Sequence, residues 1–187
     1  MDNRNPPSYQ LVAALLPENL TAIVMETQGV LFREGGLPFA QALPPFVPLR
    51  WCTDTPERLP KLLTHSERPE TGALPLSIGG WIGVESEGAA PFVVAAALEV
   101  HPSDGIEKLV DFFARRSPQG PHLFDGYLGS LVLAVAPQGT HREGALPSPR
   151  RLTAKVLRLG LLRITLKEEM VYWEEYELGW LSGSRNR

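Results

Sequence analysis

The amino-acid sequence predicts an α+β fold in which short strands outnumber helices. Three observations indicate this class. Short apolar runs bounded by Pro or Gly recur along the chain, as strands would. Two longer segments carry apolar residues at helical spacing. Two strand-like segments near the C-terminus adjoin across a charged turn, which is typical of an antiparallel hairpin.

The first part of the chain is expected to form a strand, a helix and a second strand. The apolar run 9–16 ends at Pro17, as a buried strand would. Segment 18–34 has apolar residues near helical spacing, starts after that proline and stops at a glycine pair, so we expect a helix. A Pro-Pro pair then opens a second strand over 46–52.

The middle of the chain mixes loops with a second set of elements. Segment 74–84 is apolar but holds three glycines, which suits a bulged strand close to another backbone. Either Ser103 or Asp104 can cap a helix that runs through Arg116. The remaining expected elements are a short helix in 56–63, a strand over 92–100 and a strand over 128–136.

The strand–helix–strand unit is interpreted as an internal repeat. Val12-Ala13-Ala14 reappears as Val94-Ala95-Ala96, 82 positions later, and Phe46 to Leu49 precedes Ser130 to Leu133 by 84. Chance similarity of two generic apolar units is the alternative. A true repeat of units 9–52 and 92–136 predicts one domain, 1–187, with two lobes related by pseudo-twofold symmetry. Antiparallel-rich sheets would then surround a central cleft where the second strands meet.

Segment 153–181 is expected to form the C-terminal hairpin. Its two halves differ in charge: seven basic residues and one acid lie between Arg142 and Lys167, whereas five acids and no base lie between Glu168 and Glu177. We interpret this asymmetry as opposite-charge pairs across the hairpin. A phosphate-contacting patch is the alternative.

The last strand of the hairpin carries four large aromatic residues in eleven positions: Tyr172, Trp173, Tyr176 and Trp180. Alternation cannot bury all four on one face of a sheet. We therefore expect exposed aromatic area and a protein partner, with a homodimer as the simplest case.

Composition excludes several classes of function. The net charge of −3 argues against a surface coated with positive charge for nucleic acid, so RNA or nucleotide binding has little support. The one cysteine, Cys52, has no clustered His and gives no metal site, and we expect no cofactor. No apolar run is long enough to span a membrane, and the N-terminus lacks a secretion signal, so the expected location is cytoplasmic.

The second strand carries the most specific family resemblance. It reads Pro44-Pro45-Phe46-Val47-Pro48-Leu49-Arg50-Trp51, and the opening LVAALLPENL is a strand followed by Pro and an acidic helix entry. Both resemble the 2H phosphoesterase superfamily, whose members typically present a PPH-x-T-L-[RK]-[FW] strand and include the bacterial RNA 2′,3′-cyclic phosphodiesterases, also called 2′-5′ RNA ligases. The resemblance spans roughly 9–181 and implies the two-lobed fold.

In that family each lobe contributes one H-x-[ST] motif. One His removes a proton from the attacking oxygen, the other protonates the leaving oxygen, and the hydroxyls hold the phosphate. Here Phe46 and Pro48 stand at the first motif, and by the repeat Ser130 and Val132 stand at the second. None of the four can act as a base. The resemblance therefore implies two degenerate motifs, no catalytic residue, and an inactive protein that serves as a binding or interaction module.

An enzyme with a rebuilt site is the alternative: an RNA or nucleotide cyclic phosphodiesterase, or a 2′-5′ RNA ligase-like enzyme. His122 is the nearest base, Asp125 can orient it, and Arg50 and Ser130 would complete the residual site. Such an enzyme needs at least two proton-transfer groups converging on one cleft. The other histidines are expected at the surface: His65, His101 and His141.

Overall fold

The described elements are two helices and eight strands. The computed structural model describes residues 7–37, 39–59, 61, 76–82, 89–101, 104–140, 146–148, 152–154, 157–167 and 170–181. The strands are β1 (Ser8–Leu15), β2 (Phe46–Trp51), β3 (Leu76–Trp81), β4 (Phe92–His101), β5 (Leu131–Pro137), β6 (Leu152–Ala154), β7 (Leu157–Lys167) and β8 (Met170–Leu181), and the helices are α1 (Glu18–Arg33) and α3 (Asp104–Arg116).

Most of the expected elements appear within a few residues of their predicted limits. The expected hairpin segment 153–181 contains three described strands: β6 pairs with β3, whereas β7 pairs with β1 and β8. The short helix expected in 56–63 and the cap at Ser103 fall wholly or partly outside the described residues. None of the described helices is both long and apolar enough to span a membrane.

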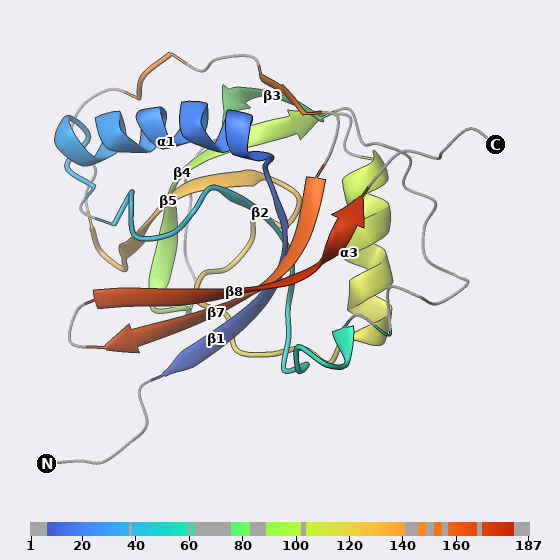
Figure 1. Ribbon diagram of the computed structural model, residues 1–187. Helices are drawn as coiled ribbons and strands as arrows, with labels where there is room; N and C mark the ends of the chain where they lie inside the picture. The colour runs from blue at the N-terminus through green and yellow to red at the C-terminus, as the bar shows by residue number, and fades with distance from the viewer. Residues whose placement is uncertain are drawn as a thin grey trace, which may run out of the picture.

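All eight strands belong to one antiparallel sheet. Their order is β6-β3-β4-β5-β2-β1-β7-β8. The sheet curls strongly, with α1 across its upper end and α3 at one side (Figure 1). The structure is therefore α+β. More than one antiparallel-rich sheet was predicted, but Phe46 of β2 pairs with Val132 of β5 and joins the two halves into one sheet.

The two halves of the sheet share a pairing register. Three residue pairs between β1 and β2 recur between β4 and β5, each 84 positions later: Val12–Arg50 and Ala96–Ala134, Ala13–Pro48 and Ala97–Val132, Ala14–Val47 and Leu98–Leu131. Both sets shift register at the same point, where one extra residue forms a bulge. This register aligns Val12 with Ala96, not with Val94 as the sequence comparison predicted. Runs of Val and Ala match at several offsets, and only the pairing selects one.

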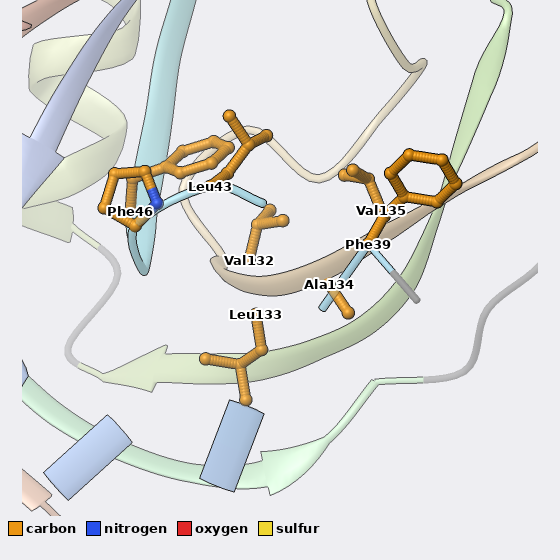
Figure 2. Close-up of a pocket in the computed structure, with 8 residues that line it drawn as sticks. Phe39, Leu43, Phe46, Val132, Leu133, Ala134 and Val135 are labelled. Carbon is orange, nitrogen blue, oxygen red and sulfur yellow. The ribbon is translucent and has the colours of Figure 1, made fainter. Parts of the chain in front are cut away.

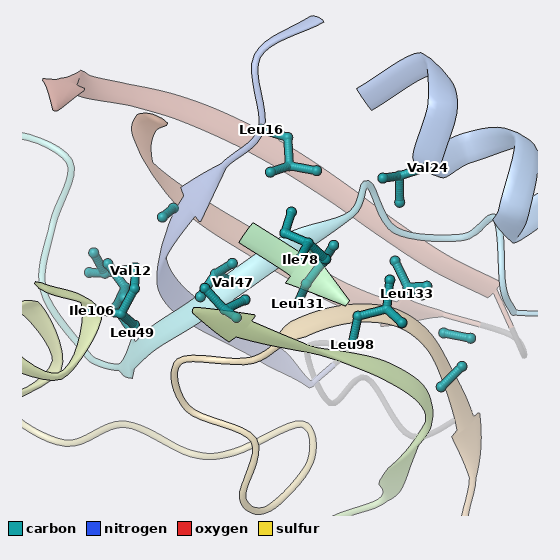
Figure 3. Close-up of a cluster of buried hydrophobic side chains, with 14 of the residues drawn as sticks. Val12, Leu16, Val24, Val47, Leu49, Ile78, Leu98, Ile106, Leu131 and Leu133 are labelled. Atoms are coloured by element: carbon teal, nitrogen blue, oxygen red, sulfur yellow. The ribbon is translucent and has the colours of Figure 1, made fainter. Parts of the chain in front are cut away.

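The two faces of the sheet are covered differently. On the helix face, α1 and α3 pack their buried residues against the strands, as with Ile106 of α3 beside Val12 and Leu49 (Figure 3). On the opposite face, loops supply the cover. We call this the loop-covered face, and its buried residues are Leu11, Ala13, Leu15, Leu43, Phe46, Trp51, Phe92, Val94, Ala97, Leu123, Phe124, Val132, Val135, Leu162 and Ile164.

Candidate functional site

The four degenerate motif positions lie where β2 and β5 meet. We call this place the seam and define it by Phe46, Pro48, Ser130 and Val132. Phe46 is the residue of β2 that pairs with Val132. Nearby, the backbone N–H of Gly129 donates a hydrogen bond of 2.9 Å to the carbonyl of Pro48. The structure thus brings the two predicted motif positions into contact.

Pro48 is tolerated in the middle of the sheet because it adjoins a bulge. Proline has no backbone N–H and is normally confined to edge strands or bulges. Here β1 pairs Ala13 with Pro48 and Val12 with Arg50, so Leu49 is the extra residue of the bulge. Without a hydroxyl or an N–H, Pro48 offers no donor to an anion.

The side chains at the seam form packed apolar core. Phe46 and Val132 are 1% and 2% exposed. The ring of Phe46 stacks on Phe124, with centroids 6.3 Å apart. Figure 2 shows Phe46, Leu43 and Val132 pointing toward one another. The small apolar pocket beside them has no room for a water molecule.

Phe124 packs against the seam, and the sequence analysis did not predict its burial. It lies in the loop between α3 and β5, is fully buried, and contacts Trp51 edge-to-face at 5.0 Å. Leu123 and Phe124 bear no periodic pattern of their own, so only their apolar character could have indicated burial.

Gln28 of α1 was also missed by the sequence analysis. It is a buried polar residue that supports the backbone beside the seam. It is 1% exposed. Its amide nitrogen donates to the carbonyls of Leu43 (3.1 Å) and Leu133 (2.8 Å). Gln28 therefore satisfies backbone acceptors on both sides of the short β2–β5 contact and ties α1 to it.

His122 has both ring nitrogens engaged. Its Nδ1 lies 3.2 Å from Oδ1 of Asp125, and its Nε2 lies 2.9 Å from the amide nitrogen of Gln119. The ring also stacks on Trp51, with centroids 6.2 Å apart. Asp125 orients His122 as expected, but the Gln119 amide occupies the nitrogen that a general base would use. The predicted acid–base role has no geometric support.

Arg50 points to the other face of the sheet. It pairs with Val12, which belongs to the helix face. Its guanidinium donates a hydrogen bond of 3.3 Å to the carbonyl of Ser117, just after α3. A cation there is favourable because the C-terminus of a helix carries partial negative charge. Trp51 and the His122 stacked on it lie on the loop-covered face. Arg50 therefore has a structural role at the end of α3, because the bulge changes the alternation of side chains along β2.

The remaining predicted groups are structural or at the surface. His101 is exposed, with Nε2 2.9 Å from the Glu99 carboxylate. His65 and His141 lie outside the described residues. Burial raises the pKa of the Cys52 thiol and keeps it protonated. Ser130 is half-buried, and the part of the chain that the structure describes contains no group of three or more potential metal ligands.

The β7–β8 hairpin carries the predicted opposite-charge pairs. Arg158 lies 2.7 Å from Glu175, and Arg163 lies 3.8 Å from Glu174. Tyr176 donates a 2.9 Å hydrogen bond to Glu174, which raises the pKa of the phenol. Arg158 and Arg163 of β7 are thus paired with acids of β8, which supports cross-strand pairing over a phosphate patch for these two arginines.

The aromatic residues of β8 are partly exposed, as predicted. Tyr172 and Trp173 are 46% and 40% exposed, and Tyr176 is half-buried against the helix-face core. The side chain of Trp180 lies outside the described part. Because neighbours in a strand point to opposite faces, aromatic area is exposed on both faces of β8.

The fold and the seam define the class of structure: an α+β protein with one curled antiparallel sheet and two described helices on the same face. No family model matches the chain, and no curated protein matches it. The chain is similar to the crystal structure of TT0787 of Thermus thermophilus, with 18% identity, a TM-score of 0.54, and coverage of 91% of this chain and 97% of that one. At this identity the likeness shows a shared fold only.

Proposed function

We propose that the chain is a catalytically inactive protein of the 2H phosphoesterase type that serves as a binding or interaction module. One observation carries the proposal: the positions that would hold the two motifs meet at the seam, where Phe46 and Val132 form buried apolar contact. The shared register of β1–β2 and β4–β5 supports the pseudo-twofold, two-lobed architecture that the resemblance implies.

The alternative of a rebuilt nucleotide or RNA phosphoesterase has weaker support. Arg50 and His122 are on opposite faces of the sheet, and both nitrogens of His122 have partners. Each general acid or base typically contributes about 10²- to 10⁴-fold to a rate, so loss of both leaves almost no turnover.

Hydrolysis of a nucleoside 2′,3′-cyclic phosphate tests the inactive assignment. At high protein concentration we expect the buffer rate, with an active 2H phosphodiesterase as positive control. A parallel NMR titration with sulfate should leave the backbone signals of Phe46 and Ser130 unmoved, because the seam has no charged side chain and the Ser130 hydroxyl is its one side-chain donor. Turnover that disappears in His122→Ala would overturn the proposal.

The binding role is supported by the exposed apolar side chains of β8. Met170 is 51% exposed, and its sulfur accepts a 3.7 Å hydrogen bond from the Tyr172 hydroxyl, whereas the exposed Trp173 lies on the opposite face of β8. Exposed Tyr and Trp are common at the energetic centres of interfaces. Sedimentation at micromolar concentration tests the homodimer, the simplest partner. A monomer whose tryptophan fluorescence resists external quenchers would contradict the partner surface.

A further inference from the structure

A groove separate from the apolar seam side chains lies between α1, the chain before β2, and the hairpin. Its volume is about 240 Å³. We call it the α1–hairpin groove, and its lining residues are Leu15, Leu16, Thr21, Met25, Gln28, Gln41, Leu43, Pro44, Pro45, Arg158, Trp173 and Glu175. Its size is slightly below the roughly 300–1,000 Å³ of sites for drug-sized molecules, so it suits one small ring system.

The rim of the groove presents two large exposed apolar side chains from different elements. Met25 of α1 is 51% exposed and Trp173 of β8 is 40% exposed. An indole offers a flat surface for stacking, and a thioether adapts to the face or edge of a ring. Two such groups on one groove favour a planar aromatic ligand.

Charge in the groove is balanced. The two terminal nitrogens of the Arg158 guanidinium lie 2.7 and 3.1 Å from the carboxylate oxygens of Glu175, and these side chains are 32% and 19% exposed. A charged ligand would be attracted by one member of the Arg158–Glu175 pair and repelled by the other. An uncharged ring with a donor and an acceptor side by side complements the pair. Gln28, fixed by two carbonyls, adds a rigid polar wall.

We propose that the α1–hairpin groove binds an uncharged bicyclic heteroaromatic ring, stacked between Trp173 and Met25 with its polar edge toward Arg158 and Glu175. The inference deepens the proposed binding function and rests on it. The ligand enters at the groove, whereas the degenerate motif side chains are packed at the seam. Binding and hydrolysis are measured separately. Ring binding together with turnover would contradict only the inactive assignment, whereas absence of both would contradict only the ring-binding inference.

The test uses 7-azaindole, which carries a ring N–H donor next to a ring nitrogen acceptor, and follows the indole N–H signal of Trp173 and the methyl signal of Met25 by NMR. Both signals should move saturably. Indole, which lacks the acceptor, should bind several-fold more weakly, on the order of one lost hydrogen bond.

Matched variants make the test specific. Trp173→Ala and Met25→Ala should each weaken binding by about tenfold, roughly the loss of one stacking contact. The controls are Leu128→Ala in the loop before β5 and Phe32→Ala on α1, exposed residues that do not line the groove. These should leave the dissociation constant unchanged. All four side chains are exposed, so the variants should fold.

Three results would overturn the inference: no signal change at millimolar 7-azaindole, equal weakening by the control variants, or movement of the Trp173 signal with protein concentration alone. The last would show that a second copy of the chain covers the groove instead of a ring.

Discussion

At the seam, Phe46 is 1% exposed and stacks on Phe124, which is 0% exposed. On the hairpin, by contrast, Tyr172 is 46% exposed and Trp173 is 40% exposed. The difference follows from position in the sheet. β2 and β5 are central strands with cover on both faces, and β8 is an edge strand. Large aromatic residues therefore stabilise the fold at the seam and remain available for binding at the hairpin.

The same contrast holds for charge. Where the resemblance implies histidines and hydroxyls, the seam has only apolar contact and one half-buried serine. The hairpin instead concentrates Arg158, Arg163, Glu174 and Glu175 in cross-strand pairs. Apolar side chains pack tightly at the seam, and the charged and exposed aromatic groups available to a ligand lie on the hairpin.

Phe124→Ala should give the largest effect, because it opens a cavity at the centre of the loop-covered face. We expect the free energy of unfolding to fall by about 3–5 kcal/mol, the usual range for truncating a buried Phe. Urea denaturation followed by circular dichroism measures it. Tyr172→Ala is the matched change at the hairpin and should stay within about 0.5 kcal/mol. Equal effects would remove the distinction between the two regions.

Phe46→His introduces the histidine that the 2H resemblance implies at this position, and it should destabilise the protein rather than create activity. The imidazole would be buried against Phe124 and Val132 without a described polar partner, which costs about 1–3 kcal/mol. Burial disfavours the charged form, so the loss should grow as the pH falls below about 6. Unfolding midpoints at pH 8 and pH 5.5 test this. An unchanged or raised stability would mean that the seam can still accommodate polar groups.

Local features of the fold could be predicted from the sequence, whereas contacts between distant residues could not. The limits of β1, α1 and β2 were predictable because apolar periodicity and the flanking Pro17 and Gly35 are local signals. The burial of Phe46 against Phe124 was not, because the two residues are far apart in the chain and a loop has no periodicity. The direction of Arg50 was missed because one bulge residue, Leu49, shifts the alternation.

Gln28→Leu tests the polar support beside the seam. The change keeps the volume nearly constant but removes the donor that satisfies the carbonyls of Leu43 and Leu133. Buried carbonyls without a partner should reduce the free energy of unfolding by about 1–3 kcal/mol. Gln41→Leu, an exposed amide on the same groove, is the control. If both variants unfolded at the same urea concentration as the parent, the support assigned to Gln28 would be wrong.

The smallest effect is expected at the hairpin, from Glu175→Gln. This change breaks the ion pair with Arg158, in which Nη1 of Arg158 lies 2.7 Å from Oε1 of Glu175 and both side chains are partly exposed. Such pairs contribute about 0–1 kcal/mol, because solvent screens them and two long side chains must be ordered. Glu174→Gln should do less, since its carboxylate is 66% exposed and lies 3.8 Å from Arg163. Denaturation at low and high salt separates charge from shape: the difference between parent and Glu175→Gln should shrink as salt rises. A loss of several kcal/mol at either salt concentration would place the hairpin among the parts that hold the fold together, and the contrast with the seam would then fail.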